Sequence, residues 1–209
     1  EIDIFVKSTS EVVYLREDDF LLIIRPDRIQ HLNSTGFEML HSLYNEKAGA
    51  EKTIDKIHSK YGTHKEIITR DLSEIVKSLN AIMRDDYKSA NKVSVVDYNP
   101  QRIKYPVLSE IALTYRCQNR CDFCYASSPF RGMEFKEMTA HQVKLIIDKI
   151  HGDAKVPTIS FTGGEPTMRK DLPELIEYAV KKGMRTNLIT NGIKSADSEL
   201  VKKLSGSGL

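Results

Sequence analysis

The chain has 209 residues, of which 40% are hydrophobic and 29% are charged, so it can bury a core in one large domain or two small ones. Its 31 Lys and Arg residues nearly balance 29 Asp and Glu residues, and a formal net charge of +2 is too small to imply a nucleic-acid footprint by charge alone. No apolar run approaches the roughly 18 residues of a membrane span, and no secretory signal opens the sequence, so we expect a cytoplasmic protein.

The N-terminal part of the sequence predicts a small α+β domain. Two apolar runs within residues 11–25 are separated by an acidic turn at residues 17–19, and residues 28–32 favour a third strand. Three amphipathic helices are expected next, the first capped by Asn33 and the second by Thr53. This order of elements is typical of a winged-helix domain.

A polar stretch at residues 85–106 separates this part from the rest of the chain. We therefore expect one domain at residues 1–84, a linker at 85–106 and a second domain at 107–209. The sequence opens on Glu1 without a methionine and closes soon after a Ser-Gly-Ser-Gly run, so we expect it to be a piece of a longer chain.

The C-terminal part alternates between strands and helices. Strands are predicted at residues 107–114, 158–162 and 185–190, and each is followed by a segment with apolar residues at helical spacing. Thr139 opens the first helix with a capping box, and Asp171 is expected to cap the second. Repeated β-α units build a parallel sheet, which is either doubly wound or curved into a barrel.

Each predicted strand is followed at its C-terminal end by an unusual sequence. The chain's three cysteines follow the first strand, residues 163–166 (Gly-Gly-Glu-Pro) follow the second, and residues 190–192 (Thr-Asn-Gly) follow the third. In a β/α barrel these three loops converge on the face that carries chemistry, so their positions favour the barrel.

The cysteines Cys117, Cys121 and Cys124 have the spacing Cys-x3-Cys-x2-Cys. Thiolates are the usual ligands of iron–sulfur clusters, and a four-iron cubane on three cysteines leaves one iron without a protein ligand. A zinc site completed by His141 or His151 is an alternative, although neither histidine has the paired spacing of a zinc knuckle. A disulfide would leave one of the three thiols unpaired.

The cysteine spacing, with the aromatic Phe123 before the last cysteine, resembles the signature of radical S-adenosylmethionine (SAM) enzymes. The resemblance implies a 4Fe-4S cluster on Cys117, Cys121 and Cys124, with the amino and carboxylate groups of SAM on the fourth iron. It also implies reductive cleavage of SAM to a 5′-deoxyadenosyl radical, with one electron from a donor such as flavodoxin or ferredoxin. The visible strands would form the first half of a (β/α) partial barrel.

The run at residues 163–166 is similar to the family's Gly-Gly-Glu-Pro motif, which binds the methionyl amino group of SAM. Asn191 is a candidate for the ribose or the SAM carboxylate, although Thr-Asn-Gly is also an ordinary turn. Tyr125 and Arg131 have no assigned role. The implied cofactor-binding residues are Phe123, Gly163, Gly164, Glu165, Pro166, Thr190 and Asn191.

The N-terminal part is similar to PqqD-like domains over residues 12–83, in its order of elements and in the runs at residues 31–33 and 53–57. Those domains recognise the precursors of ribosomal-peptide maturases. The resemblance implies a precursor peptide whose leader segment adds to an exposed strand edge, while the barrel acts on the tethered core segment.

Two other functions are possible from the sequence. Radical chemistry could act on a small molecule or RNA. An iron–sulfur redox sensor could control a DNA-binding winged helix, but the acidic bias of the first half argues against that function.

Overall fold

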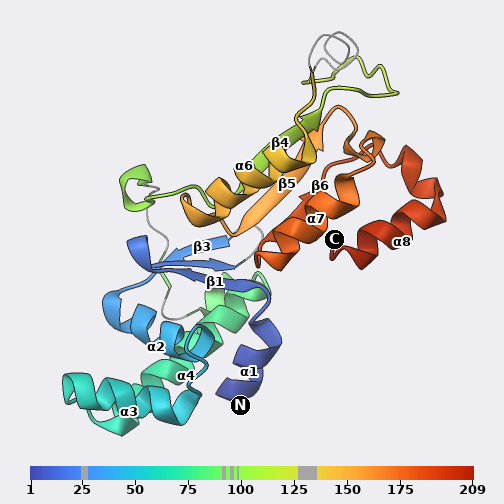
Figure 1. The fold of residues 1–209 in the computed structure, drawn as a ribbon. Coiled ribbons are helices and arrows are strands. Elements are labelled where there is room, and N and C mark those ends of the chain that lie inside the picture. Colours follow the sequence, from blue (N-terminus) through green and yellow to red (C-terminus); the bar gives the residue numbers. More distant parts are fainter. Residues whose placement is uncertain (25–27, 91–92, 95–96, 98, 127–135) are drawn as a thin grey trace. The chain divides into compact units, whose positions relative to one another are not determined.

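The computed structural model describes the chain except residues 25–27, 91–92, 95–96, 98 and 127–135. The chain divides into two compact units, Glu1–Lys104 and Tyr105–Leu209 (Figure 1). The division lies near the C-terminal end of the stretch that was expected to join two domains. None of the helices in the described residues combines the length and the apolar character that crossing a membrane requires.

The first unit is an α+β structure around an antiparallel sheet with the strand order β1-β2-β3. The acidic turn Glu17–Asp19 joins the first two strands, as predicted, and helix α1 precedes the elements that the sequence predicted. The elements are α1 (Ile2–Thr9), β1 (Val13–Arg16), β2 (Leu21–Ile24), β3 (Arg28–His31), α2 (Ser34–Tyr44), α3 (Ala50–Tyr61) and α4 (Lys65–Met83).

Two helix starts in this unit test the predicted N-caps. The Asn33 side chain accepts a hydrogen bond from the Gly36 N–H at 2.7 Å, which confirms the predicted cap of α2. The predicted cap at Thr53 is wrong, because α3 begins at Ala50 and Thr53 lies inside it. The buried Thr53 hydroxyl instead lies 2.8 Å from the Gly49 C=O, one turn earlier, and 2.9 Å from Ser42 Oγ of helix α2.

The segment after α4 packs onto the first unit. Ala90 is buried in an apolar cluster with residues of β1, β2, α2 and α4, and Val93 packs against the same cluster. Farther along, the Lys104 backbone N–H donates to Asp19 Oδ2 at 2.9 Å. Asp19 is also paired with the buried Arg16 at 2.9 Å. These contacts explain why the first unit extends to Lys104.

The second unit contains a parallel sheet with the strand order β4-β5-β6. Helices α6 and α7 lie on the same face of this sheet (Figure 1), and their apolar residues form one core with the strands and α8. The elements are β4 (Ser109–Thr114), α6 (Ala140–Gly152), β5 (Thr158–Gly163), α7 (Leu172–Lys181), β6 (Arg185–Leu188) and α8 (Ser198–Gly206). The three predicted β-α units are therefore present in a mixed α/β fold.

Two helix starts in the second unit test the capping predictions. Thr139 and Gln142 form the predicted capping box of α6. Asp171 occupies the N-cap position of α7 but makes no side-chain capping bond, so that prediction is corrected. Its carboxylate instead accepts two hydrogen bonds from the Arg169 guanidinium, at 2.9 and 2.6 Å, and such bidentate charged pairs are among the strongest hydrogen-bonded contacts.

Candidate cofactor site at the strand ends

The loops after β4, β5 and β6 are fastened together at the carboxyl ends of the strands. The Gly164 N–H donates to the Thr114 C=O at 2.7 Å, and the Glu165 N–H donates to the Arg116 C=O at 2.9 Å. The Asn191 N–H donates to Glu165 Oε2 at 2.8 Å. The loop after β5 therefore connects the loop after β4 to the loop after β6. The three unusual sequences lie together at the carboxyl ends of the strands.

The two glycines allow close approach to protein backbone. Gly163 has a φ of +129°, and a Cβ there would lie 2.1 Å from the Thr114 carbonyl oxygen. A Cβ on Gly164 would lie 2.5 Å from the Arg116 carbonyl oxygen. Because they lack a Cβ, the two glycines bring their backbone close to the end of β4 and to the first residues of the cysteine loop.

Glu165 is fully buried, and the protein itself supplies donors to both carboxylate oxygens. Oε1 accepts from the Thr167 N–H at 3.0 Å, the Thr167 hydroxyl at 2.6 Å and the Thr190 hydroxyl at 2.7 Å. Oε2 accepts from the Asn191 N–H at 2.8 Å. Burial favours the neutral acid and would raise the pKa, but these donors outweigh it and hold the pKa of Glu165 below its usual value.

Asn191 connects the third loop to the first cysteine. Its Oδ1 accepts from the Ile193 N–H at 3.0 Å and from Gln118 Nε2 at 3.3 Å. Its Nδ2 then faces Cys117 and donates to Sγ at 3.8 Å. The Thr190 and Asn191 side chains each accept from the backbone N–H two residues on, and Asn191 also reaches a predicted cluster ligand.

The cysteine loop has a donor set suited to an iron–sulfur cluster. Cys121 is exposed, whereas Cys117 and Cys124 are partly buried, and all three are free thiols. The Asn119 N–H donates to Cys117 Sγ at 3.4 Å, the kind of bond that supports a thiolate. A cubane holds each thiolate on a different iron, so the thiolates need not converge on one point.

A single-ion site has less support. The part of the chain that the structure describes contains no group of three or more His, Cys, Asp or Glu residues that could hold a metal ion. His141 and His151, the candidate zinc ligands, both lie on helix α6.

The remaining predicted residues differ in exposure. Phe123 is 90% exposed, so its ring is accessible to a ligand. Pro166 is buried and opens a short 3-10 turn, Pro166–Met168. Tyr125 is also exposed, yet its hydroxyl bonds Thr162 Oγ1 at 3.0 Å and so joins the cysteine loop to β5. Arg131 lies outside the described residues.

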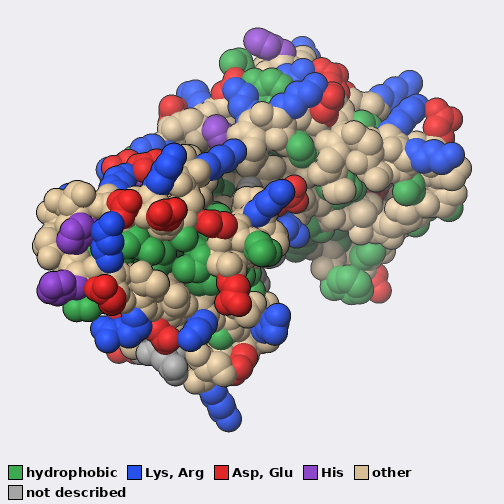
Figure 2. Space-filling view, turned by 90° about the horizontal axis from the view of Figure 1, so that it is seen from below, with side chains coloured by type: hydrophobic (Ala, Val, Ile, Leu, Met, Phe, Trp, Pro, Cys, Tyr) green, Lys and Arg blue, Asp and Glu red, His purple; other side chains and the backbone are tan. Residues whose placement is uncertain are grey.

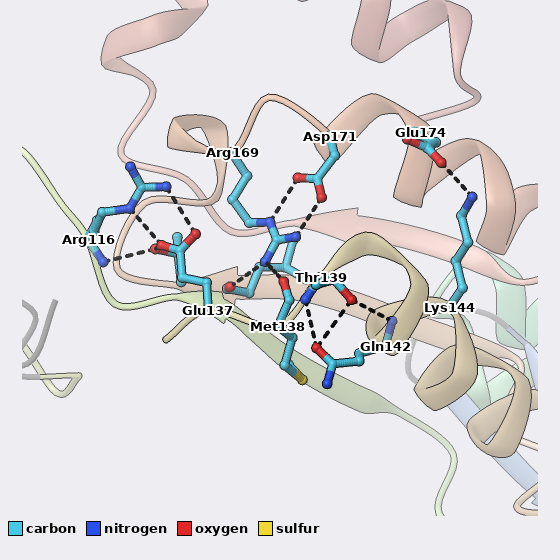
Figure 3. A network of polar contacts seen from close by, with 11 residues as sticks. Arg116, Glu137, Met138, Thr139, Gln142, Lys144, Arg169, Asp171 and Glu174 are labelled. Atoms are coloured by element: carbon cyan, nitrogen blue, oxygen red, sulfur yellow. Dashed lines mark hydrogen bonds and ion pairs between the residues drawn. The ribbon is translucent and has the colours of Figure 1, made fainter. Parts of the chain in front are cut away.

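Charged residues that the motifs did not reveal brace the start of the cysteine loop (Figure 3). The Arg116 guanidinium binds Glu137 at 2.6 and 3.1 Å, and Glu137 also accepts from the Thr114 hydroxyl. The Arg116 hydrogen bond lowers the pKa of Glu137 below its usual value. Nothing in their spacing marked Arg116 or Glu137, because 21 residues separate them in sequence.

The buried Arg169 forms the centre of the same region (Figure 3). Besides its pair with Asp171, it donates to the Leu113 C=O at 3.0 Å and to the Met138 C=O at 2.8 Å. It therefore ties the end of β4 to the residue that precedes the cap of α6.

Comparison with known proteins identifies this part of the chain. The family model of the Radical SAM superfamily matches residues 111–209. Over 98 residues the chain is 46% identical to Fe-coproporphyrin III synthase of Methanosarcina barkeri, covering 46% of this chain and 24% of that protein. Over 105 residues it is 34% identical to PqqA peptide cyclase of Bradyrhizobium diazoefficiens, covering 50% of this chain and 27% of that protein. Both relatives are enzymes by name, and the chain spans about a quarter of each.

Among solved structures, the chain is similar in fold to Streptococcus suis SuiB. The TM-score is 0.55 at 19% identity, covering 92% of this chain and 44% of SuiB. SuiB has also been solved with its precursor peptide SuiA and with S-adenosylmethionine. The likeness extends over both units and supports a mixed α/β fold. The match to the Radical SAM superfamily model lies within the second unit, at residues 111–209.

Proposed function

We propose that this protein is a radical SAM enzyme that modifies a ribosomally made precursor peptide. Its first unit is a PqqD-like, winged-helix domain that recognises this peptide. The observation that carries the proposal is the presence, in one chain, of a match to the radical SAM family and of a first unit with an open strand edge beside an apolar groove. The PqqA peptide cyclase relative and the SuiB–SuiA structure support a peptide substrate.

The residues of the second unit fit the cofactors that the family uses. Cys117, Cys121 and Cys124 would hold three irons of a 4Fe-4S cluster, and the exposed Phe123 lies beside them in sequence. When bound, the cluster and SAM supply one-electron cleavage of SAM to a 5′-deoxyadenosyl radical, with the electron from a flavodoxin or ferredoxin. The hydrogen bonds through Gly164, Glu165 and Asn191 hold the loops in fixed positions, as the control of a radical requires.

The open edge belongs to strand β3. The Leu32 N–H donates to the Phe20 C=O at 2.9 Å, which fixes the alternation of backbone groups along the strand. Residues 28 and 30 then direct their backbone groups toward β2, whereas Ile29 and His31 direct theirs outward. Within the described residues no strand pairs with this outer edge. The edge can therefore accept an extended peptide by β-augmentation.

An apolar groove of about 440 Å³ lies beside this edge. It would bury side chains of the added strand, and burial stabilises a bound peptide by roughly 25 cal/mol for each Å² of apolar surface. In Figure 2 acidic and basic side chains are intermixed on the visible face, without a broad basic region that would suit nucleic acid. Apolar residues of β2, β3 and α4 that line the groove are Leu22, Ile29, Leu32, Ile75, Leu79 and Ile82.

Reconstitution tests the chemistry. The protein would be loaded with iron and sulfide without air, reduced with dithionite in the presence of SAM, and assayed for 5′-deoxyadenosine. We expect product from the wild type and none from Cys121→Ala. Zinc in place of iron in metal analysis, or undiminished product from Cys121→Ala, would contradict the assignment.

A proline substitution that removes one backbone N–H tests the peptide site. His31→Pro removes the outward N–H of β3 without removing a bond to β2, and His31→Ala keeps that N–H as the matched control. A hydrogen bond contributes about 1 kcal/mol, so the proline variant should bind precursor peptides about fivefold more weakly. The probes are short peptides encoded beside this protein's gene, with affinity measured by calorimetry. Equal affinities for the two variants would argue against strand addition.

A second candidate is radical chemistry on a small molecule. It is favoured by the 46% identity to Fe-coproporphyrin III synthase, which exceeds the identity to the peptide cyclase. If none of the peptides binds while SAM cleavage is intact, this candidate is preferred.

A further inference from the structure

We propose that Glu165 is a positioning residue that controls the environment of the Cys117 sulfur through Asn191. This inference rests on the proposed function, because it concerns the cluster that Cys117 would hold. It assigns Glu165 a task different from direct contact with the amino group of SAM. Asn191 is assigned as a hydrogen-bond donor to the cluster ligand.

The surroundings of Glu165 leave it little capacity for a ligand. Its carboxylate is fully buried, and four donors within 3.0 Å occupy its two oxygens. Three of these donors bind Oε1 and one binds Oε2, so an ammonium group would compete with bonds that the protein already makes. The present arrangement therefore favours a carboxylate that holds protein segments together.

The bonds of Glu165 lead to Cys117 from two sides. Its backbone N–H holds the C=O of Arg116, the residue immediately before Cys117, at 2.9 Å. Its Oε2 holds the backbone of Asn191 at 2.8 Å. Hydrogen bonds of Glu165 therefore hold both the residue before Cys117 and the backbone of Asn191, whose amide donates to Cys117.

The orientation of the Asn191 amide is fixed by the bonds to its oxygen. Because Oδ1 accepts from the Ile193 N–H and from Gln118, the amide nitrogen is the group that faces Cys117 Sγ. Hydrogen bonds to ligand sulfurs stabilise the added electron of a reduced cluster and raise its reduction potential. Loss of the Asn191 donor should therefore make the cluster harder to reduce.

The test measures the midpoint potential of the reconstituted cluster by EPR-monitored titration, without SAM or peptide. Asn191→Asp keeps an acceptor for Ile193 and replaces the donor by an oxygen, so we expect a lower potential. Glu165→Gln presents an amide where Asn191 N–H needs an acceptor, and we expect a shift in the same direction. Each shift should correspond to about threefold to tenfold in the reduction equilibrium, where tenfold is ~59 mV for one electron.

A second pair of variants covers the case in which Glu165→Gln does not fold. Thr190→Val removes one donor to Glu165 and should lower the potential by a smaller amount, whereas Thr190→Ser keeps the hydroxyl and should restore the wild-type value. In addition, Glu165→Gln or Thr190→Val should cause no further shift in a chain that already carries Asn191→Asp. A role in folding alone would not produce this non-additivity.

Three outcomes would overturn the inference. They are an unchanged potential in Asn191→Asp, full additivity of the shifts, or a Glu165→Gln variant that loses only SAM affinity in a binding assay while its potential is unchanged. The last result would make Glu165 a direct SAM ligand. Failure of the wild type to assemble a cluster would overturn the proposed function as well, so the two failures are distinguishable.

Discussion

The two units bury different kinds of side chain. In the second unit, charged and hydroxyl groups are buried where the strands end, and each charge has protein partners, as Glu165 and Arg169 show. In the first unit the interior is mainly apolar, and the buried pair of Arg16 and Asp19 lies at the turn between two strands. Directional hydrogen bonds therefore fix the strand ends of the second unit, whereas within the described residues the first unit has an unpaired strand edge and an apolar groove.

The largest expected effect is the loss of Arg169. In Arg169→Met the carbonyl groups of Leu113 and Met138 lose their donor and Asp171 loses its charge partner. Removal of one member of a buried pair costs about 3–5 kcal/mol, so the second unit should lose most of its stability. Urea unfolding would measure the loss. The matched control is Lys181→Met, because the Lys181–Glu177 pair is exposed and should matter by less than about 0.5 kcal/mol. Similar losses in both variants would refute the stabilising role assigned to the buried Arg169.

Gly164→Ala tests the close approach of backbone segments. The new Cβ would meet the carbonyl oxygens of Arg116 and Tyr115 at 2.5 and 2.8 Å, and neither can move without displacing the cysteine loop. Overpacking of this kind costs about 1–3 kcal/mol, and we expect iron retention to fall as well. Gly206→Ala is the control, since nothing lies within 4 Å of its Cβ position. Thermal unfolding and iron analysis of the two variants give the comparison, and an equally stable Gly164→Ala would show that the loop can yield.

Acid should weaken the second unit through Glu137 and Glu165. Both have a pKa in the folded protein below the ordinary value of 4.5, so their stabilisation is complete above that value and is lost as pH falls through the lower folded pKa. Glu137→Gln should therefore reduce the dependence of the unfolding temperature on pH in this acid range. Because the Arg116–Glu137 pair is partly exposed, its share is at most about 1 kcal/mol. If the unfolding temperature of Glu137→Gln depends on pH as strongly as that of the wild type, Glu137 does not contribute to the acid sensitivity.

The smallest effect on stability is expected for Phe123→Ala. The ring is 90% exposed, so its removal should change the free energy of unfolding by less than about 0.5 kcal/mol. If Phe123 contacts the cofactor, SAM affinity of the reconstituted protein should fall although stability does not, and equilibrium binding would detect this. Leu145→Ala, also exposed, is the control and should change neither quantity.

What the sequence could predict depends on the range of the interaction. Caps at Asn33 and Thr139 were predicted correctly because their partners lie three residues away. Thr53 and Asp171 are residue types that often cap helices. In the structure the Thr53 hydroxyl contacts Ser42 of another helix, and the Asp171 carboxylate binds Arg169. Residue type and spacing alone do not reveal such competition.

The same limit applies to the candidate site. Its motifs and their order after three strands were visible in the sequence, and the structure places them at one sheet edge. The hydrogen bond between Asn191 and Glu165 spans 26 residues, and only the folded chain reveals it. The residues of the β3 groove likewise come from strand and helix segments far apart in sequence.

The bond between Lys104 and Asp19 has a practical meaning for anyone who wishes to study the first unit by itself. An excised fragment that stopped at the last turn of α4 would uncover the apolar surface beneath Ala90 and deprive a buried carboxylate of a backbone donor. Cutting after Lys104 keeps both, so peptide-recognition assays with a minimal fragment should use that boundary.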